Sequence, residues 1–375
     1  MPALEVRMNK TLGSALIVAG TTIGAGMLAL PLATAKLGFA LSSLLLVVFA
    51  LLAVKAAWMM IDHCIALAGP ASLDALGRKA FGPMGRVLVA LAMGMLYYAL
   101  MAAYVSGSAS LIGASLGFGQ GLAALLASLV VGLLVMFSTQ VVDISNRLLF
   151  SLKMVALALV IAGLMPSIDG ASLSQGGVMP LAALPIIYTA FGYHGSLPTL
   201  VNYLEKDRQK LRLAITWGTL LPLALYLVWQ AVVLGSLTPE ALAATDGKLE
   251  VLIGALTHQQ QGWLSQCIHL FADLALATSF LGVAVGMFDF LAALFNRQSS
   301  LAGRSQTALL TFIPPLAVAL FYPNAFISAL GFAALALAFM ALVLPAVMSL
   351  QQKRHPEGAL LLVAAALVFV AQLAG

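Results

Sequence analysis

The sequence predicts an all-helical membrane protein with eleven spanning helices, arranged as two inverted halves of five followed by one additional helix. Three observations predict this fold class. Hydrophobic residues make up 62% of the chain and charged residues only 8%, whereas a soluble domain carries about 25% charged residues. Apolar runs of roughly 20 residues, each long enough to cross about 30 Å of hydrocarbon, recur along the chain. Glycine-rich interruptions occur at matching places in the two halves.

The apolar runs are separated by short polar or Gly/Pro-rich loops, and each run defines one expected span. Because the runs occupy nearly the whole sequence, we expect residues 1–375 to form a single transmembrane domain. The expected spans are residues 12–35, 40–67, 86–115, 121–142, 145–165, 180–203, 211–236, 262–293, 306–321, 325–350 and 358–374.

The two halves of the chain repeat one pattern. Gly24 and Pro31 in the first expected span recur, after nearly equal lengths of chain, as Gly192 and Pro198 in the sixth. A repeat unit of five spans is odd, so the second half enters the membrane from the opposite side, as in transporters with inverted repeats. The expected repeats and the extra helix cover about residues 10–165, 178–350 and 358–374.

The basic side chains indicate the orientation. With the N-terminus in the cytoplasm, every Lys and Arg except Lys36, Lys55 and Lys248 falls on the inner side, Lys153 included, and the C-terminus lies outside. We therefore attribute the net charge of +5 to attraction toward anionic inner-leaflet lipids rather than to nucleic acid. The two cysteines are expected near opposite membrane faces, so we expect neither a disulfide nor a redox or metal site.

The interruptions are the main indication of function. Residues 20–26 read Gly-Thr-Thr-Ile-Gly-Ala-Gly, and residues 191–195 read Phe-Gly-Tyr-His-Gly. An unpaired backbone polar group in hydrocarbon costs several kcal/mol, so non-helical chain at membrane depth persists only where it lines a cavity or binds something. Close helix packing is the alternative for a single glycine cluster. Two matching breaks flanked by polar side chains favour a binding site.

Each break exposes both signs of charge. Freed amides at the start of a second half-helix suit a carboxylate, whereas carbonyls at the end of a first half-helix suit an ammonium group or a cation. Together the two poles describe an α-amino acid. A channel is disfavoured because the polar intramembrane residues gather at the breaks rather than along a pore. An enzyme is disfavoured because Ser196 lacks a G-x-S-x-G setting and Asp273 and Asp289 share one helix.

Long motifs resemble a known family. Residues 9–14 (NKTLGS), continuing at 18–31 (VAGTTIGAGMLALP), are similar to the opening signature of bacterial aromatic amino acid permeases. Residues 191–198 (FGYHGSLP) and 269–282 (HLFADLALATSFLG) are similar to the tyrosine-specific members. The resemblance covers essentially the whole chain, although Lys55 departs from the apolar or neutral residue expected in the second span.

The resemblance implies a LeuT-like fold of five plus five helices with broken helices 1 and 6, in the bacterial cytoplasmic membrane. It also implies import of tyrosine, or a related aromatic amino acid, by symport with a proton, without a cofactor or enzymatic activity. The implied substrate-binding residues are Thr21, Thr22, Gly24, Ala25, Gly26, Tyr104, Tyr188, Ala190, Phe191, Gly192, Tyr193 and His194.

Within this set, the amides of residues 24–26 are expected to receive the carboxylate, and carbonyls of residues 21–22 and 188–190 the ammonium group. Helices three, six, eight and ten are expected to surround the aromatic side chain. His194 is the candidate partner for a tyrosine hydroxyl, because a site built to bond that group rejects an analogue lacking it. The alternatives are a histidine bonded to neighbouring backbone and, for Tyr104, a packing role.

The coupling ion has two candidate sites on the eighth span. Asp273 and His269 lie about 40° apart on one helical face and can share or relay a proton, because intramembrane carboxylates are rare and usually functional. A structural hydrogen bond is the alternative. Thr278 and Ser279 lie roughly 140° and 240° round from Asp273; in sodium-coupled relatives of this fold, such hydroxyls contact the ion together with carbonyls of the broken first helix. The resemblance favours the proton over sodium. The candidate ion-coupling residues are Asp273, His269, Gly20, Ile23, Thr278 and Ser279.

Overall fold

The computed structural model describes residues 9–374 apart from residues 138, 259, 261, 298 and 299. Within this part of the chain, all regular secondary structure is helical, which confirms the predicted class. The elements are α1 (Lys10–Thr22), α2 (Gly26–Thr34), α3 (Gly38–Ile65), α4 (Leu73–Phe81), α5 (Pro83–Leu116), α6 (Gln120–Phe137), α7 (Thr139–Leu164), the 3₁₀ turn η1 (Met165–Ser167), α8 (Gly170–Leu173), α9 (Ala183–Thr189), the 3₁₀ turn η2 (His194–Ser196), α10 (Leu197–Tyr203), α11 (Arg208–Ser236), α12 (Pro239–Ala243), α13 (Leu249–His258), α14 (Trp263–Leu294), α15 (Leu301–Phe321), α16 (Ala325–Ala338), the π-helical segment η3 (Phe339–Val343), α17 (Leu344–Gln351) and α18 (His355–Ala374).

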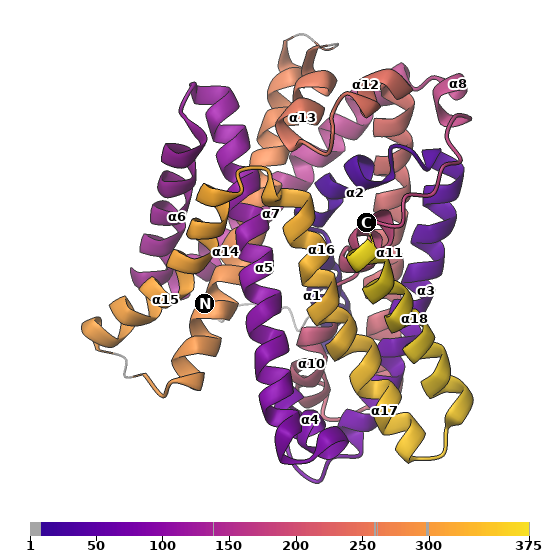
Figure 1. Cartoon of the computed structure of the whole chain (residues 1–375), viewed down its shortest axis with the longest axis vertical. Helices are drawn as coiled ribbons and strands as arrows, with labels where there is room; N and C mark the ends of the chain where they lie inside the picture. Colours follow the sequence, from indigo (N-terminus) through magenta and orange to yellow (C-terminus); the bar gives the residue numbers. More distant parts are fainter. Residues whose placement is uncertain (1–8, 138, 259, 261, 298–299, 375) are drawn as a thin grey trace, which may run out of the picture.

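Figure 1 shows the long helices running between two ends of the molecule, one that carries α4 and one that carries α8, α12 and α13. We call these the α4 end and the α13 end. Seven of the described helices are long and apolar enough to span a membrane, and the bent pair of α1 and α2 makes an eighth. The protein is therefore a multi-pass membrane protein. The other expected spans correspond to α6, α9 with α10, and α15, so the count of eleven and the repeat boundaries stay predictions.

The first helix breaks where the sequence places its first glycine cluster. α1 ends at Thr22 and α2 begins at Gly26, and the two segments are bent by 51°. The amide of Ile23 closes α1 by donating to the Ala19 carbonyl, after which the ψ angle of Ile23, 86°, leaves the helical region. The predicted break in helix 1 is confirmed.

The sixth helix breaks in the same manner. α9 ends at Thr189, and α10 begins at Leu197 with Pro198 in its first turn, where the missing proline N–H leaves no helix hydrogen bond unmade. Between them, a Cβ atom on Gly192 would lie 2.9 Å from the Thr189 carbonyl oxygen, so the tight return of the chain depends on glycine. The predicted break in helix 6 is confirmed.

Ion pairs join distant segments at the α4 end. Asp62 of α3 lies 3.1 Å from the Arg208 guanidinium and 3.2 Å from that of Arg212, both on α11. Lys10, at the start of α1, pairs with Glu205 at 2.8 Å, just beyond α10. The hydrogen bond from Lys10 lowers the pKa of the Glu205 carboxyl below its ordinary value. The Asp62 pairs therefore join α3 to α11, and the Lys10 pair joins the two broken helices to each other.

Two lysines, Lys55 and Lys153, lie well away from the ends of long helices. Lys55 of α3 pairs with Glu357 of α18 at 2.8 Å, so the residue that departs from the family pattern forms an ion pair between these helices. The expectation that Lys153 lies on the inner side with the loop charges is wrong. Its side chain is only 2% exposed and reaches the first break from α7.

Candidate functional site

The two breaks lie against each other, buried among the helices. A Cβ atom on Gly26 would lie 3.6 Å from the Cα atom of Ala190, so the main chains of the two breaks meet closely. The Tyr226 hydroxyl of α11 lies 2.6 Å from the Thr22 carbonyl oxygen and 3.0 Å from that of Ala190. The carbonyls predicted to bind an ammonium group are thus brought together at one point.

α11 holds both breaks through a stripe of buried side chains. The Trp229 indole N–H donates to the Met27 carbonyl at 3.0 Å, and the Gln230 amide donates to the Thr34 hydroxyl at 2.6 Å. The Thr219 hydroxyl lies 3.0 Å from that of Tyr193. These α11 residues share one helical face. Sequence reasoning missed them, although their polar and aromatic spacing within an apolar span was a usable signal.

The ammonium group of Lys153 lies beside the first break. Its Nζ donates to the Ile23 carbonyl at 2.9 Å and to the Thr278 hydroxyl of α14 at 3.2 Å. The Phe150 ring faces the same nitrogen at 4.4 Å from its centroid, and a Cβ atom on Gly20 would lie 3.9 Å from that ring. Charges inside a membrane protein need such partners. The position of this basic residue, well inside an expected span, was a signal of an interior role that the assignment of Lys and Arg to the inner side overlooked.

Ser279 contacts the other side of the same break. Its hydroxyl group accepts a hydrogen bond from the Ala25 amide at 2.8 Å and donates one to the Ala275 carbonyl at 2.8 Å. A Cβ atom on Gly24 would lie 2.7 Å from this oxygen, so only glycine admits the contact without displacement. Thr278 and Ser279 therefore both lie on the face of α14 that meets the broken first helix.

The predicted aromatic residues are buried. Tyr188, Phe191 and Tyr193 are fully buried, and Tyr104 is 7% exposed. The His194 Nε2 lies 3.1 Å from the Ala53 carbonyl oxygen and donates to it. This contact is the backbone-bonded arrangement that the sequence left open as the alternative for His194.

Other predicted residues lie differently. The hydroxyls of Thr21 and Thr22 donate back to carbonyls of α1, at 2.8 Å and 2.7 Å, so these hydroxyls are left only as acceptors. Asp273 is exposed and His269 partly exposed, on a face of α14 turned away from Thr278. The structure does not bring this pair to either break.

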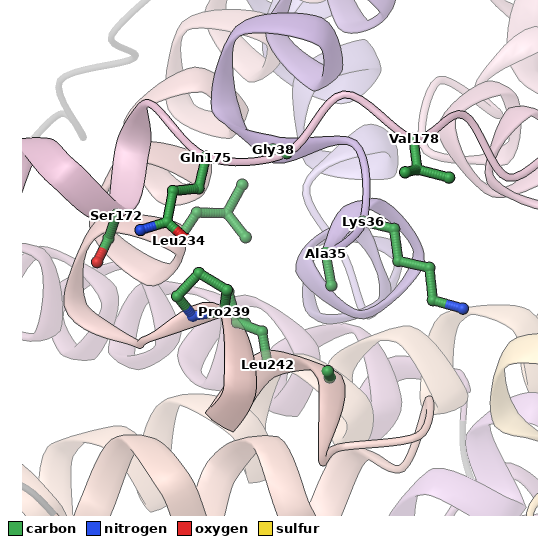
Figure 2. A pocket seen from close by; sticks show the side chains of 11 residues that line it. Ala35, Lys36, Gly38, Ser172, Gln175, Val178, Leu234, Pro239 and Leu242 are labelled. Carbon is green, nitrogen blue, oxygen red and sulfur yellow. The ribbon is translucent and has the colours of Figure 1, made fainter.

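A separate cavity of about 250 Å³ lies at the α13 end (Figure 2). It is bounded by the ends of α2 and α11, the start of α3, the segment around α8, and α12. Figure 2 shows Leu234, Pro239 and Leu242 around it, whereas the Lys36 side chain points away. None of the predicted site residues lines this cavity, which separates it from the breaks.

Comparison with known proteins agrees with this geometry. The chain matches the tryptophan/tyrosine permease family over residues 7–371. It is 38% identical to tyrosine-specific transport system 1 of Haemophilus influenzae, over 90% of this chain and 87% of that protein. It is 37% identical to the tryptophan-specific transport protein of Pseudomonas aeruginosa, over 93% and 88%. A mutant manganese transporter of Eremococcus coleocola has a similar fold, with a TM-score of 0.64 at 20% identity, over 100% of this chain and 88% of that chain.

Two broken helices whose backbone poles meet inside a helix bundle are typical of a membrane transport protein. The chain belongs to the tryptophan/tyrosine permease family. It is accordingly a permease rather than an enzyme.

Proposed function

We propose that this permease imports tyrosine, or a related aromatic amino acid, across the bacterial cytoplasmic membrane together with a proton. The names of the relatives, tyrosine-specific and tryptophan-specific, support the aromatic substrate. The Lys153 ammonium group supports the proton, because it lies on the carbonyl and hydroxyl oxygens that the sodium alternative requires. This single observation carries the choice of coupling ion.

The proposed substrate site uses the backbone poles of both breaks. The Ser279 hydroxyl oxygen accepts from the Ala25 amide, where a substrate carboxylate oxygen is expected. The Tyr226 hydroxyl lies within hydrogen-bonding distance of the carbonyls of Thr22 and Ala190, where the substrate ammonium group is expected. An acceptor thus contacts the exposed amide and a donor contacts the exposed carbonyls. These contacts support the proposal that the same main-chain groups bind the carboxylate and the ammonium group of an α-amino acid.

The aromatic side chain of the substrate is proposed to pack beside the second break. Phe191 lies there in edge-to-face contact with Tyr226, with ring centroids 5.6 Å apart, and Tyr104 of α5 supplies a further buried ring. We assign His194 a positioning role, because its Nε2 already bonds to Ala53. Tyr188, Gly192 and Tyr193 would then shape the wall of the subsite.

The contacts of Lys153 support the proposed proton coupling. Its ammonium group joins α1 to α14 by donating to Ile23 and Thr278. A sodium ion on the same oxygens would meet the like charge of the ammonium group. Loss of a proton would remove the charge and weaken both hydrogen bonds, so α1 would be freed to move. Protonation of Lys153 and movement of α1 are thereby linked. Asp273 remains the alternative candidate for the proton carrier, favoured only by its residue type.

The orientation is part of the proposal. Lys10, Arg208, Arg212 and Arg354 gather at the α4 end, so we assign this end to the cytoplasm. The N-terminus is then cytoplasmic and the C-terminus outside, and the basic cluster faces anionic lipid. Residues 1–8 and 375, which include the chain ends themselves, lie outside the described residues.

Uptake into proteoliposomes tests the proposal. We expect radiolabelled tyrosine to accumulate when an inward proton gradient is imposed without sodium, and unlabelled aromatic amino acids to compete with it. A sodium gradient alone should give no accumulation. Accumulation that follows the sodium gradient and ignores the proton gradient would contradict the coupling, and failure of all aromatic competitors would contradict the substrate class.

A further inference from the structure

We propose that Tyr226 is a positioning residue that determines recognition of the substrate's amino group. The inference rests on the proposed function, because it concerns the same site. It concerns a helix, α11, that the sequence indicated only as an apolar span. Its basis is that one hydroxyl group contacts a carbonyl from each of the two breaks.

The two carbonyls that Tyr226 contacts both lie at the end of a half-helix. Thr22 is the last residue of α1, and Ala190 is the C-cap of α9. Each carbonyl therefore lies at the negative end of a half-helix dipole. The Tyr226 hydroxyl is 2.6 Å from one oxygen and 3.0 Å from the other. It holds two mutually repelling carbonyls close together and directed at one point.

The hydrogen-bond inventory leaves room for an ammonium group. A phenol hydroxyl has one proton and acceptor lone pairs, and each carbonyl oxygen has two lone pairs. One proton therefore cannot saturate both carbonyls. An α-ammonium group carries three N–H donors, which match the two carbonyls and the phenol oxygen. Tyr226 thus supplies both the spacing of the carbonyls and a third acceptor.

Tyr226 is itself held rigidly. Its side chain is fully buried, and the Phe191 ring lies edge-to-face on its own. One turn further along α11, Trp229 donates to the carbonyl of Met27, on the far side of the first break. α11 therefore fixes the main chain on both sides of that break. A hydroxyl held in this way can set the geometry of a site, since its own position is determined by packing.

A purely structural role would give a different result from a role in amino-group recognition. If the hydroxyl only secures the helix ends, its removal weakens binding of every ligand to the same extent. If the hydroxyl positions the carbonyls for an ammonium group, its removal weakens the binding of tyrosine more than the binding of a ligand without that group. The suitable probe is des-aminotyrosine, which has hydrogen in place of the amino group of tyrosine.

The experiment compares the dissociation constants of tyrosine and des-aminotyrosine for the purified full-length protein and for Tyr226→Phe. Both constants are measured on one preparation, so their ratio does not depend on the folded fraction. We expect the preference for tyrosine to fall by about tenfold in Tyr226→Phe, the effect of losing a hydrogen bond to a charged group. Tyr98→Phe is the matched control, because the Tyr98 hydroxyl also donates to a carbonyl, that of Leu310 at 2.8 Å, away from the breaks.

A ratio unchanged in Tyr226→Phe, with both ligands weakened alike, would overturn the inference and leave the proposed function intact. An equal fall in Tyr98→Phe would also overturn it. A native protein that binds neither ligand, or prefers neither, would instead contradict the proposed substrate class. The two failures are therefore distinguishable.

Discussion

Replacement of Lys153 by methionine isolates the buried charge, because methionine keeps a long flexible side chain and removes the ammonium group. The Ile23 carbonyl and the Thr278 hydroxyl then lose their charged donor, at 2.9 Å and 3.2 Å. A hydrogen bond to a charged group contributes about 1.5–3 kcal/mol. Loss of the shorter bond alone would weaken the attachment of the first break to α7 by about 2 kcal/mol, a factor of about 30.

The same substitution removes the cost of burying a charge, so the overall stability of the fold should change little. We therefore expect a folded Lys153→Met protein in which amides around the first break exchange hydrogen about 30-fold faster. In proteoliposomes it should lose accumulation driven by a proton gradient and retain exchange of labelled for unlabelled tyrosine. Lys36→Met, the same chemical change at an exposed residue of the α13 end, is the matched control.

Accumulation by Lys153→Met at the native level would refute the reasoning. Asp273→Asn discriminates between the two candidate carriers. It should keep accumulation, because Asp273 is exposed and lies away from the breaks. Loss of accumulation in Asp273→Asn but not in Lys153→Met would return the coupling role to the carboxylate.

Two further predictions follow from single contacts. Gly24→Ala should weaken tyrosine binding strongly, because the new Cβ would lie 2.7 Å from the Ser279 hydroxyl oxygen and overpacking costs about 1–3 kcal/mol. Adding Ser279→Ala should restore part of the affinity in a binding assay. A double variant that binds no better than the single one would argue against the clash. Because Lys10 depresses the pKa of Glu205, their ion pair stabilises the fold above the ordinary carboxyl pKa of 4.5, and this contribution disappears as pH falls. Melting temperatures of the native protein and Glu205→Gln should thus differ at neutral pH and converge in acid, whereas a constant difference would exclude the ion pair as its cause.

The breaks were predictable because their causes are local. Glycine and proline act on their own backbone through missing Cβ atoms and a missing N–H, so Gly24 and Pro198 mark the interruptions without knowledge of the neighbours. The poles exposed at a break follow from helix polarity alone. The helical repeat also separated Thr278 and Ser279 from the face of α14 that carries Asp273.

The contacts that complete the site were not predictable in the same way. Helices inside a membrane bundle are apolar on all sides, so the hydropathy pattern does not reveal which face points inward. Lys153 and Tyr226 belong to helices whose inward faces are determined only by packing against other helices. Asp273 illustrates the reverse case, since a carboxylate in an apolar span suggested an interior role and the structure exposes it.

Tyrosine-driven proton movement tests the central claim most directly. Sodium-free proteoliposomes that contain a pH-sensitive dye should acidify inside when tyrosine is added outside, and the acidification should disappear in Lys153→Met. Entry of labelled tyrosine that requires sodium and leaves the internal pH unchanged would contradict the account.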